Sequence, residues 1–214
     1  MSGLLLTNYY LVYRSVFAYS GLAILVSGLM LFFGDTSMYR FAALLTTLLV
    51  AMPAIEIIKY EGKSGYDKYV LTLPVSRSNI VKSHYFFYLL TVIIGTILSY
   101  AILYVYGLIS ESPINAILNI VFLGTVIVLI SGAIAYPFLY VFGLEKSDAI
   151  SIGSAFGGLV TTLGLQSLVG YLIEQLPLNI DHSLFVPVIF LLFGIIIYIL
   201  SFFVAALIYR RKEF

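Results

Sequence analysis

The run Leu184–Tyr209, LFVPVIFLLFGIIIYILSFFVAALIY, contains no charged residue and decides the class of this protein. A helix needs about 20 apolar residues to cross a hydrocarbon core about 30 Å thick. Since 62% of the 214 residues are hydrophobic and only 10% are charged, a soluble domain of this size is excluded. We expect an all-α polytopic membrane protein in which residues 1–214 form one transmembrane domain. The apolar runs predict six spans: Val16–Phe33, Phe41–Ile58, Tyr85–Ile109, Asn115–Phe142, Ile150–Leu172 and Leu184–Tyr209.

Lysine and arginine residues set the expected orientation, because positively charged loops stay on the cytoplasmic side. Of the 11 basic residues, Arg40 is alone on one side of the predicted spans. The others flank the first and sixth spans or lie in the loops after the second and fourth: Arg14, Lys59, Lys63, Lys68, Arg77, Lys82, Lys146, Arg210, Arg211 and Lys212. Both termini are therefore predicted to be cytoplasmic. The tyrosine-rich residues before the first span indicate either a short interfacial helix or an irregular start of that span.

The motifs of hydrolytic and redox enzymes are missing from the sequence. There is no cysteine and no H-E-x-x-H run, and His84 and His182 are expected on opposite faces of the membrane. Gly62-Lys63-Ser64 resembles part of a P-loop, but Ile57 stands where that motif has its first glycine. We expect no catalytic residue, and no metal or cofactor bound by this chain.

Few polar side chains lie within the predicted spans. Glu56 is the one carboxylate placed inside a span, and an interfacial ion pair with Lys59 is favoured over a role in transport. Asn119 and Gln166 are expected to form hydrogen bonds between helices. If the protein moves a substrate, the energy is therefore expected to come from elsewhere.

The loop Lys59–Lys82 is longer than a connection between two helices requires. Ser64 and Asp67 predict a helix start with a capping box, and Pro74 predicts its end. Four residues follow the i, i+3, i+4, i+7 spacing of one apolar helix face: Tyr66, Tyr69, Val70 and Leu73. This amphipathic helix either docks on a partner or lies in the membrane interface. Ser76 or Ser78 is expected to cap the third span.

A second, shorter cytoplasmic loop follows the fourth span. Pro137 predicts a kink in that span, because it frees the carbonyl of Ala133. Gly143 marks the predicted end of the helix, and Glu145 and Lys146 occupy the loop.

The fifth span begins with Ser147 as a plausible cap and carries small residues at helical spacing. Gly153 and Gly157 form a G-x-x-x-G pair that Gly164 extends. Such a stripe favours close packing of another helix over a transport pathway.

Two segments carry a family resemblance. LPVSRSNIVKSHY (Leu73–Tyr85), preceded by a glutamate near the end of the second span, and YPFLYVFGLEKSDAISIG (Tyr136–Gly153) resemble small ABC-2-type transporter permeases. Within that group the chain looks most like the permeases of phenol-soluble modulin exporters.

The resemblance implies two paired permeases above two cytoplasmic ATPase subunits, which bind ATP and Mg²⁺. It also implies that the loop after the second span carries a coupling helix seated on the ATPase. Tyr66, Tyr69 and Leu73 would anchor it, and the charged residues would fix its register. The positions carried over are Lys63, Tyr66, Asp67, Lys68, Tyr69, Leu73, Pro74, Val75, Ser76 and Arg77. The family's external segment corresponds to about Leu165–Pro177.

The sequence thus predicts the permease subunit of an ATP-driven exporter in a bacterial cell membrane. With a second permease, the same or related, it would form the path for a hydrophobic or amphipathic substrate such as a cytolytic or antimicrobial peptide. No nucleic-acid partner is expected. The alternative is a non-transporting membrane protein, such as a scaffold, an immunity factor or a sensor subunit. The two differ in whether a partner ATPase requires the loop helix.

Overall fold

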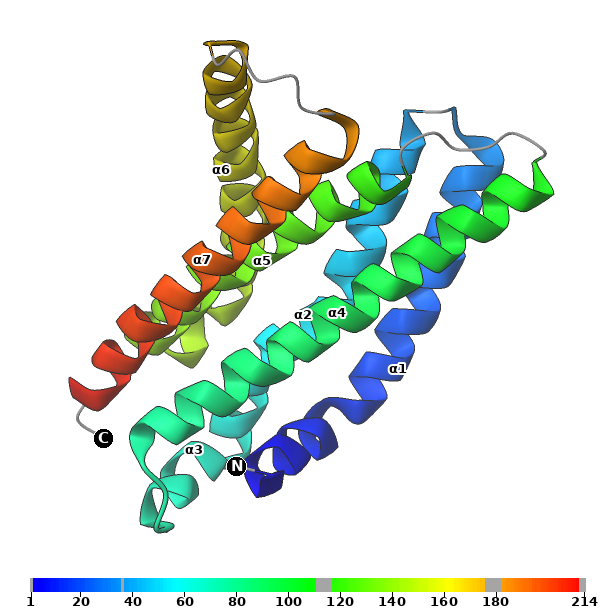
Figure 1. The fold of residues 1–214 in the computed structure, drawn as a ribbon. Helices are drawn as coiled ribbons and strands as arrows, with labels where there is room; N and C mark the ends of the chain where they lie inside the picture. The colour runs from blue at the N-terminus through cyan, green and yellow to red at the C-terminus, as the bar shows by residue number, and fades with distance from the viewer. Residues whose placement is uncertain (1, 36, 111–116, 176–181, 212–214) are drawn as a thin grey trace.

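The computed structural model describes residues 2–35, 37–110, 117–175 and 182–211, and within these ranges the chain is helical and contains no strand (Figure 1). The helices are α1 (Ser2–Phe33), α2 (Met38–Ser64), α3 (Tyr66–Tyr69), η1 (Val70–Thr72), α4 (Arg77–Ile109), α5 (Ile117–Phe142), η2 (Leu144–Lys146), α6 (Ser147–Gln175) and α7 (His182–Arg211). The two η elements are short 3₁₀ helices. Among the described residues, α1, α2, α4, α5, α6 and α7 are long and apolar enough to cross a membrane. The all-α class and the six spans are confirmed.

The second and third predicted spans extend well beyond their predicted ends. α2 continues past Ile58 to Ser64, and α4 begins at Arg77 instead of Tyr85. The 33 residues of α4 reach about 50 Å at 1.5 Å per residue, well beyond a hydrocarbon core of about 30 Å. Hydropathy marks only the part of a helix that lipid surrounds, so it missed these polar extensions. The connection between α2 and α4, which we call the first loop, is reduced to Gly65–Ser76.

The outer ends of the last two spans lie partly beyond the described residues. α6 continues without interruption to Gln175, so the described part of the predicted external segment Leu165–Pro177 prolongs that helix. The predicted start of the fourth span at Asn115 falls outside the described residues.

The N-terminal residues belong to one continuous helix. α1 runs from Ser2 to Phe33, and its first turns pack on the protein: Val12 is buried in the core and Leu4 lies against it. Asn8 is also buried, with its side-chain amide 3.5 Å from the hydroxyl of Ser83. The start of the first span is therefore packed on α4, rather than being a separate interfacial helix.

The beginning of α1, the helix α3 and the end of α7 lie at the same end of the bundle (Figure 1). We call this the basic end, because the first loop, the start of α4 and the end of α7 carry Lys68, Arg77, Arg210 and Arg211 there. Arg40 stands in the first turn of α2, at the opposite end. The basic residues that the sequence assigns to one side of the membrane therefore lie at one end of the bundle, and Arg40 lies at the other.

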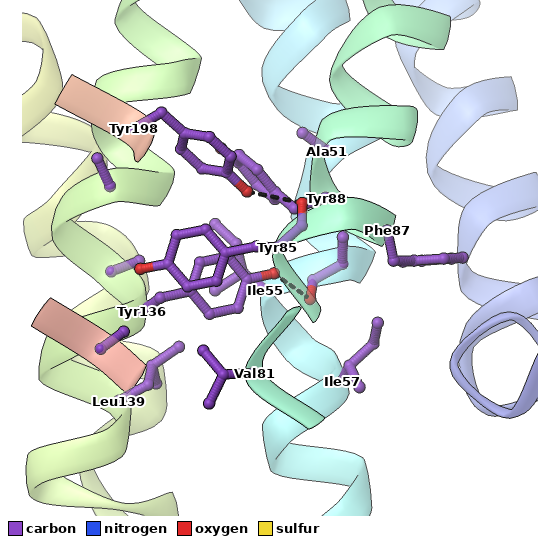
Figure 2. Close-up of a cluster of buried hydrophobic side chains, with 14 of the residues drawn as sticks. Ala51, Ile55, Ile57, Val81, Tyr85, Phe87, Tyr88, Tyr136, Leu139 and Tyr198 are labelled. Atoms are coloured by element: carbon purple, nitrogen blue, oxygen red, sulfur yellow. Dashed lines mark hydrogen bonds between the residues drawn. The ribbon is translucent and has the colours of Figure 1, made fainter. Parts of the chain in front are cut away.

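The centre of the bundle is a cluster of tyrosines from α4, α5 and α7 that packs against apolar residues of α2 (Figure 2). The hydroxyl of Tyr88 donates to the carbonyl of Val128 at 2.6 Å, and that of Tyr198 donates to the carbonyl of Tyr85 at 2.8 Å. Within lipid a polar group must find its partner inside the protein, so each such bond ties two helices together. α1 packs outside this cluster on α2 and α4, and α6 packs mainly on α5.

Pro137 lies inside α5, as predicted, and the carbonyl that it frees has a new donor. The hydroxyl of Ser201 in α7 donates to the carbonyl of Ala133 at 2.5 Å. The same hydroxyl is 2.8 Å from that of Tyr85, so α4, α5 and α7 meet at this point. The loss of one helical bond in α5 thus creates a contact between helices.

The close approach of α6 to α5 is made by Gly158. A Cβ atom on Gly158 would lie 2.7 Å from the carbonyl oxygen of Ile127, whereas a Cβ on Gly157 would meet only a side-chain carbon, at 3.2 Å. Cβ atoms on Gly153 and Gly164 would meet no atom within 4 Å, so these two glycines face away from the rest of the chain. The polar side chains of Asn119 and Gln166, expected between helices, are exposed on the surface of the chain.

Candidate functional site at the basic end

The first loop begins at a glycine that ends α2. Gly65 has φ 72° and ψ 7°, the left-handed conformation that ends many helices, and its N–H donates to the carbonyls of Glu61 and Gly62. The predicted capping box is wrong, because Ser64 is still part of α2. Its hydroxyl turns back to the carbonyl of Glu61 at 3.0 Å and does not cap α3.

The loop helix is shorter than predicted. α3 ends at Tyr69, and η1 continues the path only to Thr72. Leu73 is extended, with φ −79° and ψ 152°, as expected for a residue that precedes a proline. Pro74 therefore accounts for the extended conformation of Leu73, and the helical residues end at Thr72.

The four residues of the predicted apolar face do not share one environment: three of them contact the protein core and one is exposed. Val70 is only 1% exposed, and Tyr66 and Leu73 pack against the same core. Tyr69 is 59% exposed. The reason is the length of α3, because a single turn followed by a 3₁₀ turn cannot keep four residues on one face. Val70 holds the loop and Tyr69 projects from it.

A groove of about 460 Å³ separates the loop from the first turns of α1. Its walls are Gly3, Leu4 and Thr7 on one side and Tyr66, Leu73, Pro74, Val75 and Asn79 on the other. The N-terminal turns of α1 therefore border the loop across this groove and pack on α4.

The exit of the loop is tied to the end of α7. Ser76 caps α4, accepting a hydrogen bond from the N–H of Asn79 at 3.3 Å, as predicted. Arg77 donates to the carbonyl of Arg210 at 3.0 Å, and Arg210 donates to the hydroxyl of Ser78 at 2.9 Å. The beginning of α4 and the end of α7 thus form one junction.

The structure also contains a buried polar group near the loop that is not among the residues predicted from the sequence. Glu61 is the second carboxylate of α2, and only 5% of it is exposed. Its Oε1 lies 3.1 Å from Nε2 of His84 in α4, and Nδ1 of His84 lies 2.7 Å from the hydroxyl of Tyr140 in α5. We call Glu61, His84 and Tyr140 the buried polar link. A sequence signal existed, because Glu61 follows the buried residues Ala54 and Ile57 by seven and four positions on one helix face.

The predicted ion pair between Glu56 and Lys59 is wrong. The Lys59 ammonium forms its ion pair with Asp148 at the start of α6, and Glu56 interacts with Tyr19 of α1. From the sequence, Glu56 is the partner expected for Lys59 because both lie on the same helix. In the folded protein Asp148 of α6 forms the ion pair instead.

The second loop, Gly143–Lys146, follows α5. Gly143 has φ 72° and its N–H donates to the carbonyl of Leu139 at 2.9 Å, which confirms it as the end of the helix. Glu145 and Lys146 are exposed, and the Lys146 ammonium lies 5.2 Å from the ring centre of Phe142. The second loop lies against α2, so both loops belong to the same end of the bundle.

Comparison with known proteins gives a family for the whole chain. No curated protein and no solved structure matches it. The family described as ABC-2 family transporter protein matches residues 3–210, nearly the full length. Together with six apolar helices, this match leads to the conclusion that the chain belongs to the ABC-2 transporter family and is a multi-pass membrane permease.

Proposed function

We propose that this chain is the permease subunit of an ATP-driven exporter in a bacterial cell membrane, with the basic end on the cytoplasmic side. Residues 1–214 form one transmembrane domain that pairs with a second permease, identical or related. Membership of the ABC-2 family supports the ATPase partner, which binds ATP and Mg²⁺ in a separate subunit. The excess of basic residues at one end supports the orientation.

The observation that carries this proposal is an exposed surface on the first loop and the last turn of α2, which are held firmly against the bundle. We define the docking surface as Lys63, Lys68, Tyr69, Thr72 and Pro74, all exposed. An aromatic ring among lysine side chains fits an apolar groove with an acidic rim, since aromatic residues often dominate the binding energy of interfaces. Tyr69 is its central anchor.

The roles carried over by family resemblance change accordingly. Tyr66 and Leu73 are half-buried against the core and support the docking surface from behind. Val75 lines the groove with them, and Asp67 in α3 and Arg77 at the start of α4 are half-buried. In this proposal Tyr69 and the lysines contact the ATPase, while the other residues hold them in register.

Short connections join the docking surface to α2 and α4, so a displacement of this surface is transmitted to both helices. Only Gly65 separates α3 from α2, and the four residues Leu73–Ser76 connect η1 to α4. α2 and α4 meet α5 and α7 in the tyrosine cluster. Closure of the ATPase on ATP therefore tilts α2 and α4 together, and this movement opens a path between the two permeases.

The proposed substrate is a hydrophobic or amphipathic molecule such as a cytolytic or antimicrobial peptide. The spans 16–33, 85–109 and 183–209 contain no Asp, Glu, Lys or Arg, so a substrate meets apolar and tyrosine side chains in the middle of the bilayer. A substrate that enters from the inner leaflet with its apolar face toward these helices needs no buried charge to receive it.

Copurification tests the docking surface. We expect the tagged permease to retain its ABC ATPase, and Tyr69→Ala to weaken this binding about tenfold or more. Tyr10→Ala is the matched control, since Tyr10 is 64% exposed and lies on α1 outside the docking surface. Equal retention of the ATPase by both folded variants would contradict the assignment.

A further inference from the structure

The last turns of α2 are held from two sides just before the first loop. Lys59 and Glu61 are two positions apart, which places their side chains about 200° apart around a helix of 3.6 residues per turn. Lys59 forms its ion pair with Asp148 of α6, and Glu61 contacts His84 of α4. α2 therefore cannot move at this end without disturbing a neighbour on either side.

The two contacts differ in strength because they differ in burial. The Asp148 side chain is 75% exposed, and exposed ion pairs contribute little. The Glu61 and His84 side chains are 7% and 2% exposed, so their separation would leave a polar group unpaired in a dry site. The stronger connection runs from α2 to α4.

His84 extends this connection to a third helix. Its second ring nitrogen contacts the Tyr140 hydroxyl, and the two rings are stacked with centroids 6.3 Å apart. The Tyr140 ring also packs on Tyr209 of α7, at 5.1 Å between centroids. Because both ring nitrogens of His84 are engaged, α2, α4 and α5 are fixed in one relative position.

The buried polar link lies close to both loops. Glu61 is three residues before the end of α2, and Tyr140 is three residues before Gly143. Each helix then ends at a glycine with φ 72°. The two glycines are the places where the backbone changes direction, and the helical turns before them are joined through His84.

We propose that Glu61, His84 and Tyr140 are positioning residues that make the first and second loops move as one body. The inference rests on the proposed function, since the movement that it transmits begins at the docking surface. When the ATPase displaces α3, the end of α2 carries α4 and α5 with it, and the second loop follows. The buried polar link thereby converts a push on one loop into a movement of three helices.

The test uses the absence of cysteine from the sequence. Lys68→Cys and Glu145→Cys introduce one spin label in each loop, at two exposed positions. The labelled chain is diluted with unlabelled wild type in lipid bilayers, and the distance distribution between the labels is measured by pulsed electron paramagnetic resonance. No ATPase is present, so the result does not depend on the proposed function.

We expect Tyr140→Phe and Glu61→Gln each to broaden this distribution. Tyr198→Phe is the matched control, because it removes an equally buried tyrosine hydroxyl that is bonded to the carbonyl of Tyr85. Tyr140→Phe alone decides the question if Glu61→Gln does not insert. A distribution unchanged by Tyr140→Phe, or broadened to the same extent by Tyr198→Phe, would overturn the proposal.

A second readout uses the complex with its ATPase. Tyr140→Phe is expected to retain the ATPase but to lower transport per ATP hydrolysed about fivefold or more, in the usual range of coupling energies between sites. Tyr198→Phe should keep the wild-type ratio. Unchanged transport per ATP in Tyr140→Phe would count against the inference, whereas failure of the wild-type chain to bind an ATPase would refute the proposed function instead.

Discussion

Tyr69 and Val70 are neighbours in the chain, yet 59% of Tyr69 is exposed and only 1% of Val70. The boundary between the exposed and the buried side of the first loop passes between these two residues. Burial of an apolar side chain stabilises the loop, and the exposed ring is available to a partner. Val70 therefore anchors the loop to the core, while Tyr69 exposes its ring to a partner.

Val70→Ala should loosen the first loop without unfolding the bundle. Loss of two buried methyl groups costs about 2 kcal/mol, or roughly a thirtyfold increase in local opening. Hydrogen exchange of the amides of residues 66–72 measures this opening. Tyr69→Ala is the comparison, and exchange as slow in Val70→Ala as in Tyr69→Ala would show that Val70 does not hold the loop.

Gly132→Ala should destabilise the tyrosine cluster. A Cβ atom there would lie 2.3 Å from Cε1 of Tyr88, so the ring or the helix must move, at a cost of about 1–3 kcal/mol. Thermal unfolding in detergent measures the loss. Gly21→Ala serves as control, since a Cβ on Gly21 meets no atom within 4 Å. A melting temperature lowered equally by both substitutions would refute the contact.

Ser201→Ala should destabilise the protein mainly because Pro137 is present. The substitution removes the donor to the carbonyl of Ala133, and a buried unsatisfied carbonyl costs about 1–3 kcal/mol. In a Pro137→Ala background the helix supplies its own donor, so Ser201→Ala should cost less there. A double-mutant cycle of unfolding free energies measures the difference. Additive effects would show that the two residues are not coupled.

The ion pair between Lys59 and Asp148 should matter little to stability. Asp148→Asn is expected to change the unfolding free energy by no more than about 1 kcal/mol, because the carboxylate is largely exposed. Glu61→Ala, which leaves His84 without its buried partner, should cost several times as much, about 3 kcal/mol or more. A larger loss for Asp148→Asn than for Glu61→Ala in the same unfolding assay would reverse this ranking.

The spans could be predicted from the sequence because lipid imposes a requirement that composition reveals. The uncharged run from Leu184 needs no partner to be recognised as a membrane helix. The end of α2 and the start of α4 could not be predicted, since these turns carry charges such as Lys59 and Lys82 while remaining helical.

The site was predicted only in part, for a similar reason. The spacing of Tyr66, Val70 and Leu73 correctly indicated an apolar contact, but not that the contact is with the protein's own core. Glu61 was placed in a loop because α2 was ended too early, and its partner His84 lies 23 positions away in the chain. Local patterns indicate which residues are buried, whereas their partners depend on packing between helices.

Reconstitution of the permease with its ATPase tests ATP-driven transport. The permease and its ABC ATPase are placed in lipid vesicles with the docking surface outward, and uptake of a fluorescent amphipathic peptide is followed. We expect uptake that requires ATP and Mg²⁺ and that falls about tenfold or more in Tyr69→Ala, with wild-type uptake in Tyr10→Ala. Uptake that is independent of ATP, or unaffected by Tyr69→Ala, would contradict the proposed function.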